Sequence, residues 1–534
     1  MQTGEVIPAE NATEIEIVAL YPNTVHDQNR GEFIVAHVPN RTHLSDWRFR
    51  DDGSQWAKPP PVEVEGMVAF SHEPNLAKEY LDIPVYPLEG WLQLAVDGET
   101  VTLEIDDTVV DEVSYSDRAP QAHLWVRGGP DHWVHLGETD FEPVDTVARA
   151  QTFVLPDSPE VITELLEGAT HRIYLGGYEL GDPTTTEALI GANERGVEVA
   201  VHAEGRPVGG ISLAYGQALD ALEDAGISVT VHAGAYRRYG FHHPKYIVVD
   251  DRVLITTENF KPAGTGGLAS RGWGVVFDAP DLADAVAAVF HADATWRDAI
   301  SWDELRDDVN RFQHDGTIGS FEQNHPPLEL DSVEMTLVVA PDTAEVTLTN
   351  LIDGAEESIH IKQVRISDID FPLMASALDR ARAGAQVRIL LSDRWYVREE
   401  NEAFAAAVEE LATADDLDIE VALVDDTERF DRIHAKGIIV DERSVVIGSI
   451  NWNNHSLREN RELAAIVHDE RAAAFYLAVF EGDWPPQRGL IWRVPIGLVV
   501  ATLAIGALAA MHAYRLRVEG TDAASEESYT ERPD

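Results

Sequence analysis

The strongest chemical signal in this chain of 534 residues is a histidine and a lysine placed just before a short apolar run. His434 and Lys436 stand two residues apart, the run 437–440 follows them, and a second apolar run leads to Asn451. Two β-branched runs with an acidic turn between them predict a pair of buried strands. Side chains two residues apart on a strand point to the same face. An imidazole beside a fixed ammonium is suited to binding and attacking a phosphate.

The same arrangement occurs a second time, earlier in the chain. His243 and Lys245 precede another apolar run, which Asp250 closes as Asp441 closes the later one. Each of the three earlier residues lies 191 positions before its counterpart, and Asn259 lies 192 positions before its own. A single His-x-Lys is a weak signal, but two copies with matching spacing predict an internal duplication.

With these residues the chain resembles the phospholipase D superfamily, the phosphodiesterases that carry two His-Lys-Asp motifs. The second copy fits the pattern HxKx4Dx6GSxN throughout, including Ser449 in its turn. The first copy departs from it, because Thr256-Thr257 stand where the pattern has Gly-Ser. The resemblance implies phosphodiester hydrolysis without a metal and without a cofactor.

The resemblance also implies roles for the motif residues. One imidazole attacks phosphorus and forms a covalent phosphohistidine, while the other protonates the leaving oxygen. By the family's usual order His243 is the nucleophile and His434 the acid, and the reverse assignment stays open. The non-bridging oxygens would be held by the lysines and asparagines of both motifs: Lys245, Lys436, Asn259 and Asn451.

Four further residues are expected to support the site. Asp250 and Asp441 end strands and are interpreted as orienting or structural groups, and Ser449 belongs to the second turn. Glu462 stands where the family often has a glutamate that supports a histidine. Gly274 occupies the equivalent place in the first copy if the apolar runs that follow are matched. The sequence therefore predicts carboxylate support for one histidine only.

The composition indicates an unusual solvent. Forty Lys and Arg against 94 Asp and Glu give a formal net charge of −54, and 44% of the residues are hydrophobic. So large a charge repels itself in dilute buffer, whereas molar salt shortens the screening length to about 3 Å. The chain therefore looks like a protein of a halophilic archaeon. The absence of cysteine excludes disulfide frameworks and cysteine chemistry.

Residues 14–117 differ in character from the rest. Segments such as GEFIVAHVPN (31–40) and GWLQLAVDGETVTLEIDD (90–107) alternate apolar and polar residues between Gly, Asn and Asp turns. This pattern predicts an all-β sandwich. It is similar to the lamin-tail domain, an immunoglobulin-like module, which implies a binding or adhesive accessory role. A plain spacer domain is the alternative.

Beyond a linker at 118–150, strands alternate with helices of ten or more residues. This alternation predicts an α/β fold. The order of predicted elements in 151–300 recurs in 333–485, after a polar connector at 301–332. We therefore expect two repeated α/β/α layered domains, similar to phospholipase D domains, that pack about a pseudo-twofold axis. Because both motifs lie in one chain, a monomer is expected.

The end of the chain predicts a membrane anchor. Residues 491–514 contain 18 consecutive uncharged residues (494–511) with Trp492 and Tyr514 at the ends, and 515–534 form an acidic polar tail. This length suits one transmembrane helix. Its flanking arginines do not decide the orientation. The given chain shows no signal peptide, which favours a cytoplasmic tail-anchored body, whereas the lamin-tail resemblance favours an extracellular body at the cell membrane, which we prefer.

Three functions are compatible with these observations. The first is a membrane-anchored phosphodiesterase acting on phospholipid or nucleic acid, and the second is a secreted-type endonuclease of the same superfamily. The third is a tethered adhesion or scaffold protein with a decayed site. The anchor favours a lipid substrate, and the lamin-tail resemblance favours a nuclease. Both complete His-Lys pairs argue against decay.

Overall fold

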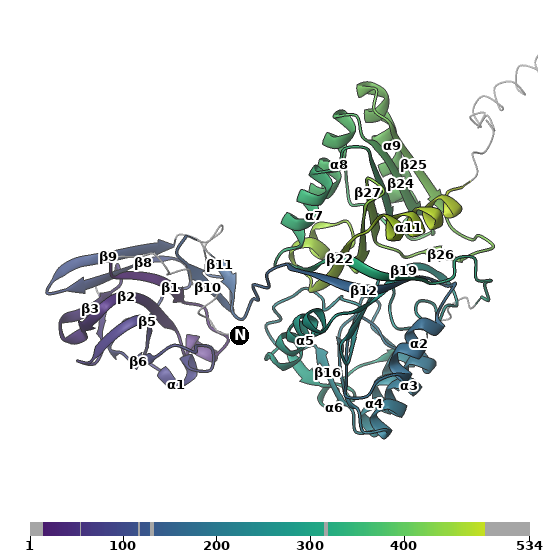
Figure 1. Ribbon diagram of the computed structural model, residues 1–534. Coiled ribbons are helices and arrows are strands. Elements are labelled where there is room, and N and C mark those ends of the chain that lie inside the picture. Colours follow the sequence, from purple (N-terminus) through teal and green to yellow (C-terminus); the bar gives the residue numbers. More distant parts are fainter. Residues whose placement is uncertain (1–13, 54, 116–117, 129–132, 314–318, 486–534) are drawn as a thin grey trace, which may run out of the picture. The chain divides into compact units, whose positions relative to one another are not determined.

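The computed structural model describes residues 14–53, 55–115, 118–128, 133–313 and 319–485 (Figure 1). The predicted transmembrane segment 491–514 and the tail 515–534 lie outside these residues. Within the described part of the chain, no helix combines the length and the apolar character needed to cross a membrane.

The N-terminal part consists of two sheets. A six-stranded sheet has the order β11-β10-β1-β2-β5-β6, and a five-stranded sheet has the order β7-β4-β3-β8-β9. The elements are β1 (Glu16–Tyr21), β2 (Phe33–His43), β3 (Trp47–Arg50), β4 (Trp56–Lys58), β5 (Glu63–Ser71), α1 (Pro74–Ala77), β6 (Val85–Pro87), β7 (Glu89–Gly90), β8 (Glu99–Ile105), β9 (Thr108–Tyr115), β10 (His123–Val126) and β11 (Trp133–His135).

One buried core joins these two sheets. Leu20 and Phe70 from the first sheet and Phe49 and Leu103 from the second belong to a single apolar cluster. Alternating side chains supply this core, as the sequence pattern predicts for a sandwich. Strands β10 and β11 come from the segment 118–150, expected to be a linker, and β10 pairs with β1. The immunoglobulin-like topology and the lamin-tail relationship stay predictions.

The remaining elements form two repeats. The first contains β12 (Val144–Leu155), α2 (Glu160–Glu167), β13 (Arg172–Gly177), α3 (Pro183–Glu194), β14 (Glu198–Glu204), β15 (Ile211–Ser212), α4 (Leu213–Asp224), β16 (Ser228–His232), β17 (Tyr246–Val249), β18 (Arg252–Thr256), β19 (Ser270–Asp278), α5 (Pro280–Thr295), β20 (Ala299–Ser301), α6 (Trp302–Leu305) and β21 (Arg311–Phe312). The second contains β22 (Leu328–Ala340), α7 (Ala344–Asp353), β23 (Ser358–Gln363), α8 (Pro372–Arg382), β24 (Gln386–Ser392), α9 (Arg398–Asp415), β25 (Ile419–Val424), β26 (Arg432–Ile433), β27 (Gly437–Val440), β28 (Ser444–Gly448), α10 (Asn454–Arg458), β29 (Glu462–His468) and α11 (Glu470–Asp483).

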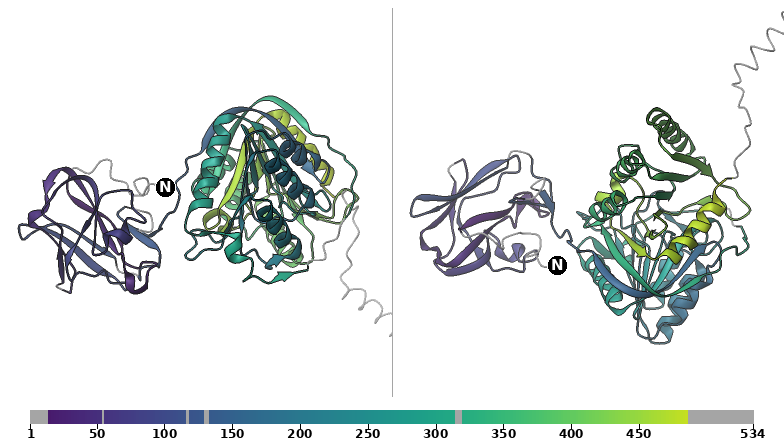
Figure 2. Two further views of the ribbon diagram at one scale, coloured as in Figure 1. Left: turned by 90° about the horizontal axis from the view of Figure 1, so that it is seen from below. Right: turned by 45° about the horizontal axis from the view of Figure 1, so that its top comes forward.

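The two repeats share one continuous sheet. Its order runs β20-β16-β14-β13-β17-β18-β19-β12 through the first repeat and β22-β29-β28-β27-β23-β24-β25 through the second. The long strands β12 and β22 pair antiparallel at the centre, with Val144 opposite Leu337 and Thr152 opposite Leu328. Helices lie on both faces of the sheet (Figure 2). The mixed α/β character and the duplicated strand order agree with the sequence prediction.

Helices α5 and α11 complete a core that spans both repeats. Phe290 of α5 and Tyr476 of α11 belong to one apolar cluster with β12 and β22. The opposite face of each half has its own core, made with α2–α4 in the first repeat and α7–α9 in the second. The central core therefore holds the repeats together through apolar contact.

A buried arginine of the first repeat adds an ionic contact between the repeats. The Arg271 guanidinium lies 2.5 Å from a carboxylate oxygen of Asp157 and 2.9 Å from one of Asp483. Asp157 follows β12 in the same repeat, whereas Asp483 ends α11 in the other repeat. All three side chains are fully buried, so each charge depends on its partners for compensation.

Arg461 makes the matching contact from the second repeat. Its guanidinium lies 2.9 Å from Asp342, which follows β22, and 3.1 Å from Asp293, which belongs to α5 of the first repeat. Each arginine thus joins a turn of its own repeat to the last long helix of the other. Apolar contact and two crossed ion-pair clusters together position the halves.

We predict that Arg461→Met lowers the free energy of unfolding by about 3–5 kcal/mol, because Asp293 and Asp342 would remain buried without a counter-charge. Urea denaturation of the full chain in molar salt measures this. The matched control is Arg458→Met. Arg458 binds Glu345 with about half of its side chain exposed, so its loss should cost less than about 1 kcal/mol. Equal effects of the two substitutions would contradict the proposed role of Arg461.

Candidate active site

His243 lies just before β17 and is held by the second repeat. Its backbone N–H donates to the carbonyl oxygen of Arg461 over 2.9 Å. Its Nδ1 lies 2.7 Å from Oε2 of Glu462, the first residue of β29. Glu462 is completely buried, whereas 13% of the His243 side chain is exposed. The carboxylate therefore orients the ring and leaves Nε2 as the nitrogen available for chemistry.

His434 follows β26 and is held by the first repeat in the same way. Its backbone N–H donates to the carbonyl oxygen of Arg271 over 3.1 Å. Its Nδ1 lies 3.1 Å from Oε2 of Glu258, and 24% of the side chain is exposed. Because each histidine is bound by a carboxylate of the other repeat, the two motifs form one site.

Both motif lysines are buried beside their histidines. Lys245 is 1% exposed and donates from Nζ to the backbone oxygen of His243 over 2.7 Å. Lys436 is 2% exposed, donates to the backbone oxygen of His434 over 2.7 Å, and has Nζ 3.1 Å from both ring nitrogens. It also lies 3.4 Å from the Thr257 carbonyl oxygen of the other repeat. The two lysine side chains therefore line the shared site.

The asparagines and the turns follow β18 and β28. Asn259 is buried; its Nδ2 donates to Glu179 over 3.3 Å, and its Oδ1 has no hydrogen-bond partner among the described residues. Asn451 is half-buried, one residue beyond Ile450. Ser449 Oγ accepts from the Leu463 N–H over 3.0 Å. Glu179 therefore orients the Asn259 amide, and Ser449 ties its turn to β29.

The Thr256-Thr257 departure preserves this turn chemistry. Thr257 Oγ1 accepts from the N–H of Trp273 over 3.0 Å, as Ser449 does from Leu463. Strand register makes Trp273 and Leu463 equivalent, since Thr256 pairs with Gly274 and Gly448 with Ala464. Thr257 therefore accepts the same backbone hydrogen bond in the first repeat that Ser449 accepts in the second.

Asp250 and Asp441 lie at the far ends of their strands. Asp250 accepts from the backbone N–H groups of Thr170, His171 and Arg172. Asp441 accepts from those of the equivalent turn, Glu356, Glu357 and Ser358. These hydrogen bonds connect the loop before β13 or β23 to the motif strand. The interpretation of both aspartates as structural groups fits this geometry.

The prediction of one-sided carboxylate support was wrong. Leu155 pairs with Gly272 and Ala340 pairs with Glu462, so the counterpart of Glu462 is Gly272 and not Gly274. A Cβ on Gly272 would lie 2.2 Å from Cγ of Glu258. The first repeat therefore takes its carboxylate from the turn, and the glycine provides the space for it. The sequence signal was a glutamate directly before Asn259, where the second copy has an apolar residue.

Burial controls the protonation of the site. It lowers the pKa of His243 to about 4 and that of His434 to about 3, against the opposing effects of Glu462 and Glu258. It lowers the pKa of Lys436 to about 8. Burial alone would raise the pKa of Glu462, but His243 and Lys245 outweigh it and hold that pKa below its ordinary value. At neutral pH the site therefore combines neutral imidazoles with ionised carboxylates.

The two repeats of one α/β sheet thus share a single site with two crossed His–Glu pairs and two buried lysines. The family model described as "Cardiolipin synthase, PLD-like domain" matches residues 162–294 and 348–484. These two matches cover both repeats and together half of the chain. The chain belongs to the phospholipase D superfamily, a family of phosphodiesterase-type enzymes.

Individual relatives match parts of the chain. A phospholipase D of Rickettsia conorii is 34% identical over 131 residues, which are 24% of this chain and 58% of the relative. A phospholipase D of Rickettsia felis is 32% identical over 149 residues, 28% of this chain and 68% of the relative. The phosphatidylserine synthase of Haemophilus influenzae has a similar structure, with a TM-score of 0.47 and 14% identity over 63% of this chain and 87% of that one.

We predict that Glu258→Gln lowers kcat on the order of 10²-fold or more, because the His434 ring loses the charge that orients it and stabilises its protonated form. Glu462→Gln should have a comparable effect through His243. The matched control is Glu459→Gln, since Glu459 contacts His455 over 2.5 Å at the surface. An unchanged rate for Glu258→Gln, with the native far-UV spectrum, would contradict the paired arrangement.

The lowered histidine pKa values predict an unusual pH profile. A lowered pKa keeps the His243 imidazole neutral as the pH falls, so a nucleophilic role for this ring predicts loss of activity near pH 4 rather than near the ordinary value of about 6.5. A diester with a nitrophenol leaving group needs little acid assistance and reports this step. Its kcat/KM should stay level from pH 7 to pH 5, and a decline centred near pH 6.5 would contradict the prediction.

Proposed function

We propose that this protein is a phospholipid phosphodiesterase that works through a covalent phosphohistidine. The observation that carries the proposal is the crossed pair of contacts, His243 with Glu462 and His434 with Glu258, around two buried lysines. This arrangement supplies a nucleophile, a proton donor and positive charge within one site.

In the first step, Nε2 of His243 attacks phosphorus and the bond from phosphorus to the leaving alcohol oxygen breaks. His434 gives that oxygen a proton. The bound phosphate anion favours this protonated form of His434, which is neutral in the free protein. Lys245 and Lys436 would stabilise the charge on the non-bridging oxygens, with Asn259 and Asn451 as further donors.

In the second step, water attacks the phosphohistidine. His434 has lost its proton in the first step and now accepts one from the water, and the bond between phosphorus and His243 breaks. The products are the alcohol and a phosphate monoester, and both histidines return to their starting states. Because the lysines neutralise the oxygens, we propose that the reaction needs no metal.

Exposed apolar side chains near the site support a lipid substrate. Val208 is 77% exposed in the loop after β14, and its N–H donates to Tyr178 over 2.6 Å. The ring centre of Tyr178 lies 4.6 Å from that of His243. This loop therefore exposes Val208 beside Tyr178, which in turn contacts His243.

The equivalent loop after β24 does the same for the other histidine. It exposes 81% of Trp395 and 47% of Tyr396. The adjacent Arg394 forms an ion pair with Asp431, three residues before His434. Tryptophan and tyrosine favour the membrane–water interface. We call Val208, Trp395 and Tyr396 the apolar rim, and we propose that it enters the lipid surface so that a headgroup phosphate reaches the histidines.

The predicted anchor fits this use. A transmembrane segment at 491–514 would keep the catalytic repeats at a membrane, in our preferred arrangement on the extracellular side and in molar salt. Nuclease activity is the second candidate, because exposed aromatic rings beside Arg394 and Arg432 can also stack on bases. The exposed apolar rim favours lipid, whereas the net charge of −54 adds little against a polyanion, because molar salt would screen it. The paired histidines and lysines weigh against a decayed scaffold.

The proposal predicts a hierarchy of substrates. Full-length protein in detergent and molar salt, with EDTA present, should cleave bis(p-nitrophenyl) phosphate and archaeal-type phospholipid vesicles, and cleave single-stranded DNA more slowly. His243→Asn and His434→Asn should each lower phospholipid turnover by 10³-fold or more, on the order of the loss of a triad member. Diester turnover that survives both substitutions would overturn the mechanism. Faster cleavage of DNA would assign the enzyme to the nucleases.

Rim variants separate surface binding from chemistry. Trp395→Ala and Val208→Ser should raise KM for vesicles and leave the soluble diester unaffected, because the rim contacts lipid rather than phosphorus. Val346→Ser is the matched control, since Val346 is 67% exposed on α7. Equal effects of Val208→Ser and Val346→Ser on vesicle turnover would contradict a role for the rim.

A further inference from the structure

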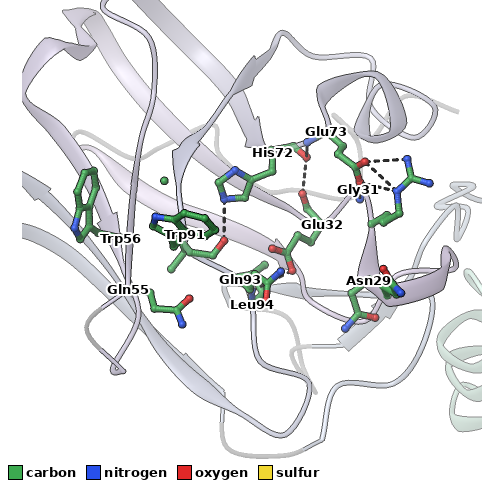
Figure 3. Close-up of a pocket in the computed structure, with 15 residues that line it drawn as sticks. Asn29, Gly31, Glu32, Gln55, Trp56, His72, Glu73, Trp91, Gln93 and Leu94 are labelled. Atoms are coloured by element: carbon green, nitrogen blue, oxygen red, sulfur yellow. Dashed lines mark hydrogen bonds and ion pairs between the residues drawn. The ribbon is translucent and has the colours of Figure 1, made fainter.

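A wide groove lies in the N-terminal domain, apart from the residues that contact the histidines. Its volume is about 1070 Å³. It lies between the turn after β1, the end of β5 and the segment that contains β7 (Figure 3). Its lining combines aromatic, amide and a few charged residues: Gln28, Asn29, Arg30, Gly31, Glu32, Gln55, Trp56, Ser71, His72, Glu73, Gly90, Trp91, Leu92, Gln93 and Leu94.

Two tryptophans form one wall of this groove. Trp91 is 82% exposed and Trp56 is 44% exposed. The backbone holds them together, since the Trp91 N–H donates to the Trp56 carbonyl oxygen over 2.9 Å. Gly90 has φ +141°, and a Cβ there would lie 2.3 Å from that oxygen. The close approach of β4 and β7 therefore needs this glycine. Their pairing brings the two indoles to the same side of the groove, and Figure 3 shows Gln55 below them.

Side chains just after β5 and just before β2 hold the backbone of the segment that carries Trp91. His72 has Nδ1 3.0 Å from the Leu88 carbonyl oxygen and Nε2 2.8 Å from the Leu92 carbonyl oxygen. Glu32 contacts the Leu94 N–H over 3.1 Å. The exposed indole of Trp91 thus stands on a backbone that is held on both sides. Trp91 is therefore an exposed indole on a backbone that hydrogen bonds hold in place, as a binding surface requires.

The polar lining of the groove is close to neutral. Amides supply four of its nine polar side chains, at Gln28, Asn29, Gln55 and Gln93. The guanidinium of Arg30 is bound by Glu73 over 2.9 Å. Burial raises the pKa of Glu32 to about 8, which makes this carboxyl neutral at pH 7 and able to donate a hydrogen bond. The free hydrogen-bonding groups are therefore uncharged donors and acceptors.

We propose that this groove binds a neutral oligosaccharide. The apolar C–H faces of a pyranose ring pack on exposed indoles, and its hydroxyl groups suit amides that both donate and accept. Polar groups that fix orientation beside an aromatic wall are typical of a ligand site. The domain thereby gains a function of its own, independent of phosphodiester cleavage: attachment of the enzyme to a glycan-bearing surface.

Charge argues against the main competing ligand. Single-stranded nucleic acid also stacks on tryptophan, but it requires a positive groove along its backbone. Residues 14–117 contain 6 Lys and Arg against 21 Asp and Glu. Arg30, the one guanidinium among the described residues that line the groove, is already paired. The groove therefore lacks an unpaired guanidinium that would bind a phosphate backbone at short range, whereas a neutral ligand needs none.

The test is calorimetric titration of full-length protein in molar salt with cellohexaose, mannohexaose and chitohexaose. Hexagalacturonate and an oligothymidylate are the anionic probes. We expect at least one neutral hexasaccharide to bind in the micromolar to millimolar range. Trp91→Ala should weaken this binding by about tenfold or more, whereas Trp91→Phe, which keeps an aromatic face, should restore most of it. Cleavage of bis(p-nitrophenyl) phosphate should be unchanged in Trp91→Ala.

Phe312→Ala is the matched control, because Phe312 is 49% exposed outside this domain. It should bind the hexasaccharide as the unsubstituted protein does. Failure of all three neutral sugars to bind, or undiminished binding by Trp91→Ala, would overturn the proposal. Preference for the oligothymidylate would replace it with a nucleic-acid site. These outcomes are independent of turnover, so failure of the proposed phosphodiesterase function would be recognised separately.

Discussion

The structure depends on a reciprocal contact between two repeats, each of which completes the active site of the other. Arg271 and Arg461 each bind a carboxylate of their own repeat and one from the last helix of the other. Their carbonyl oxygens accept the backbone N–H groups of His434 and His243. The residues that hold the interface therefore also place the two histidine rings, and the position of each ring depends on the docking of the repeats.

The two repeats make the same His–Glu contact with residues from different positions in each repeat. In the second repeat the supporting carboxylate is Glu462, the first residue of β29. In the first repeat it is Glu258, from the turn after β18, and Gly272 leaves the space that the Glu258 side chain occupies. Thr257 likewise makes the hydrogen bond that Ser449 makes. The two repeats thus reach equivalent electrostatics through different residues.

The apolar rim and the groove at Trp91 are proposed to bind two different kinds of ligand. The apolar rim beside the histidines would meet the lipid that carries the phosphate, whereas the groove at Trp91 would meet uncharged hydroxyl-rich material. In molar salt, long-range attraction is screened within about 3 Å. Under that condition a chain with a net charge of −54 would recognise its ligands through short-range contact, which exposed indoles can provide.

The sequence by itself determined the duplication, the α/β class and the six motif residues, because spacing and strand periodicity are local properties of the chain. Helix and strand positions in the repeats followed from the same periodicity. Tertiary structure alone decided the joining of both halves through β12 and β22, the pairing of β10 with β1, and the partnership of Glu258 with His434. These contacts join residues far apart in the chain, where the register of distant strands, and not local pattern, sets which side chains meet.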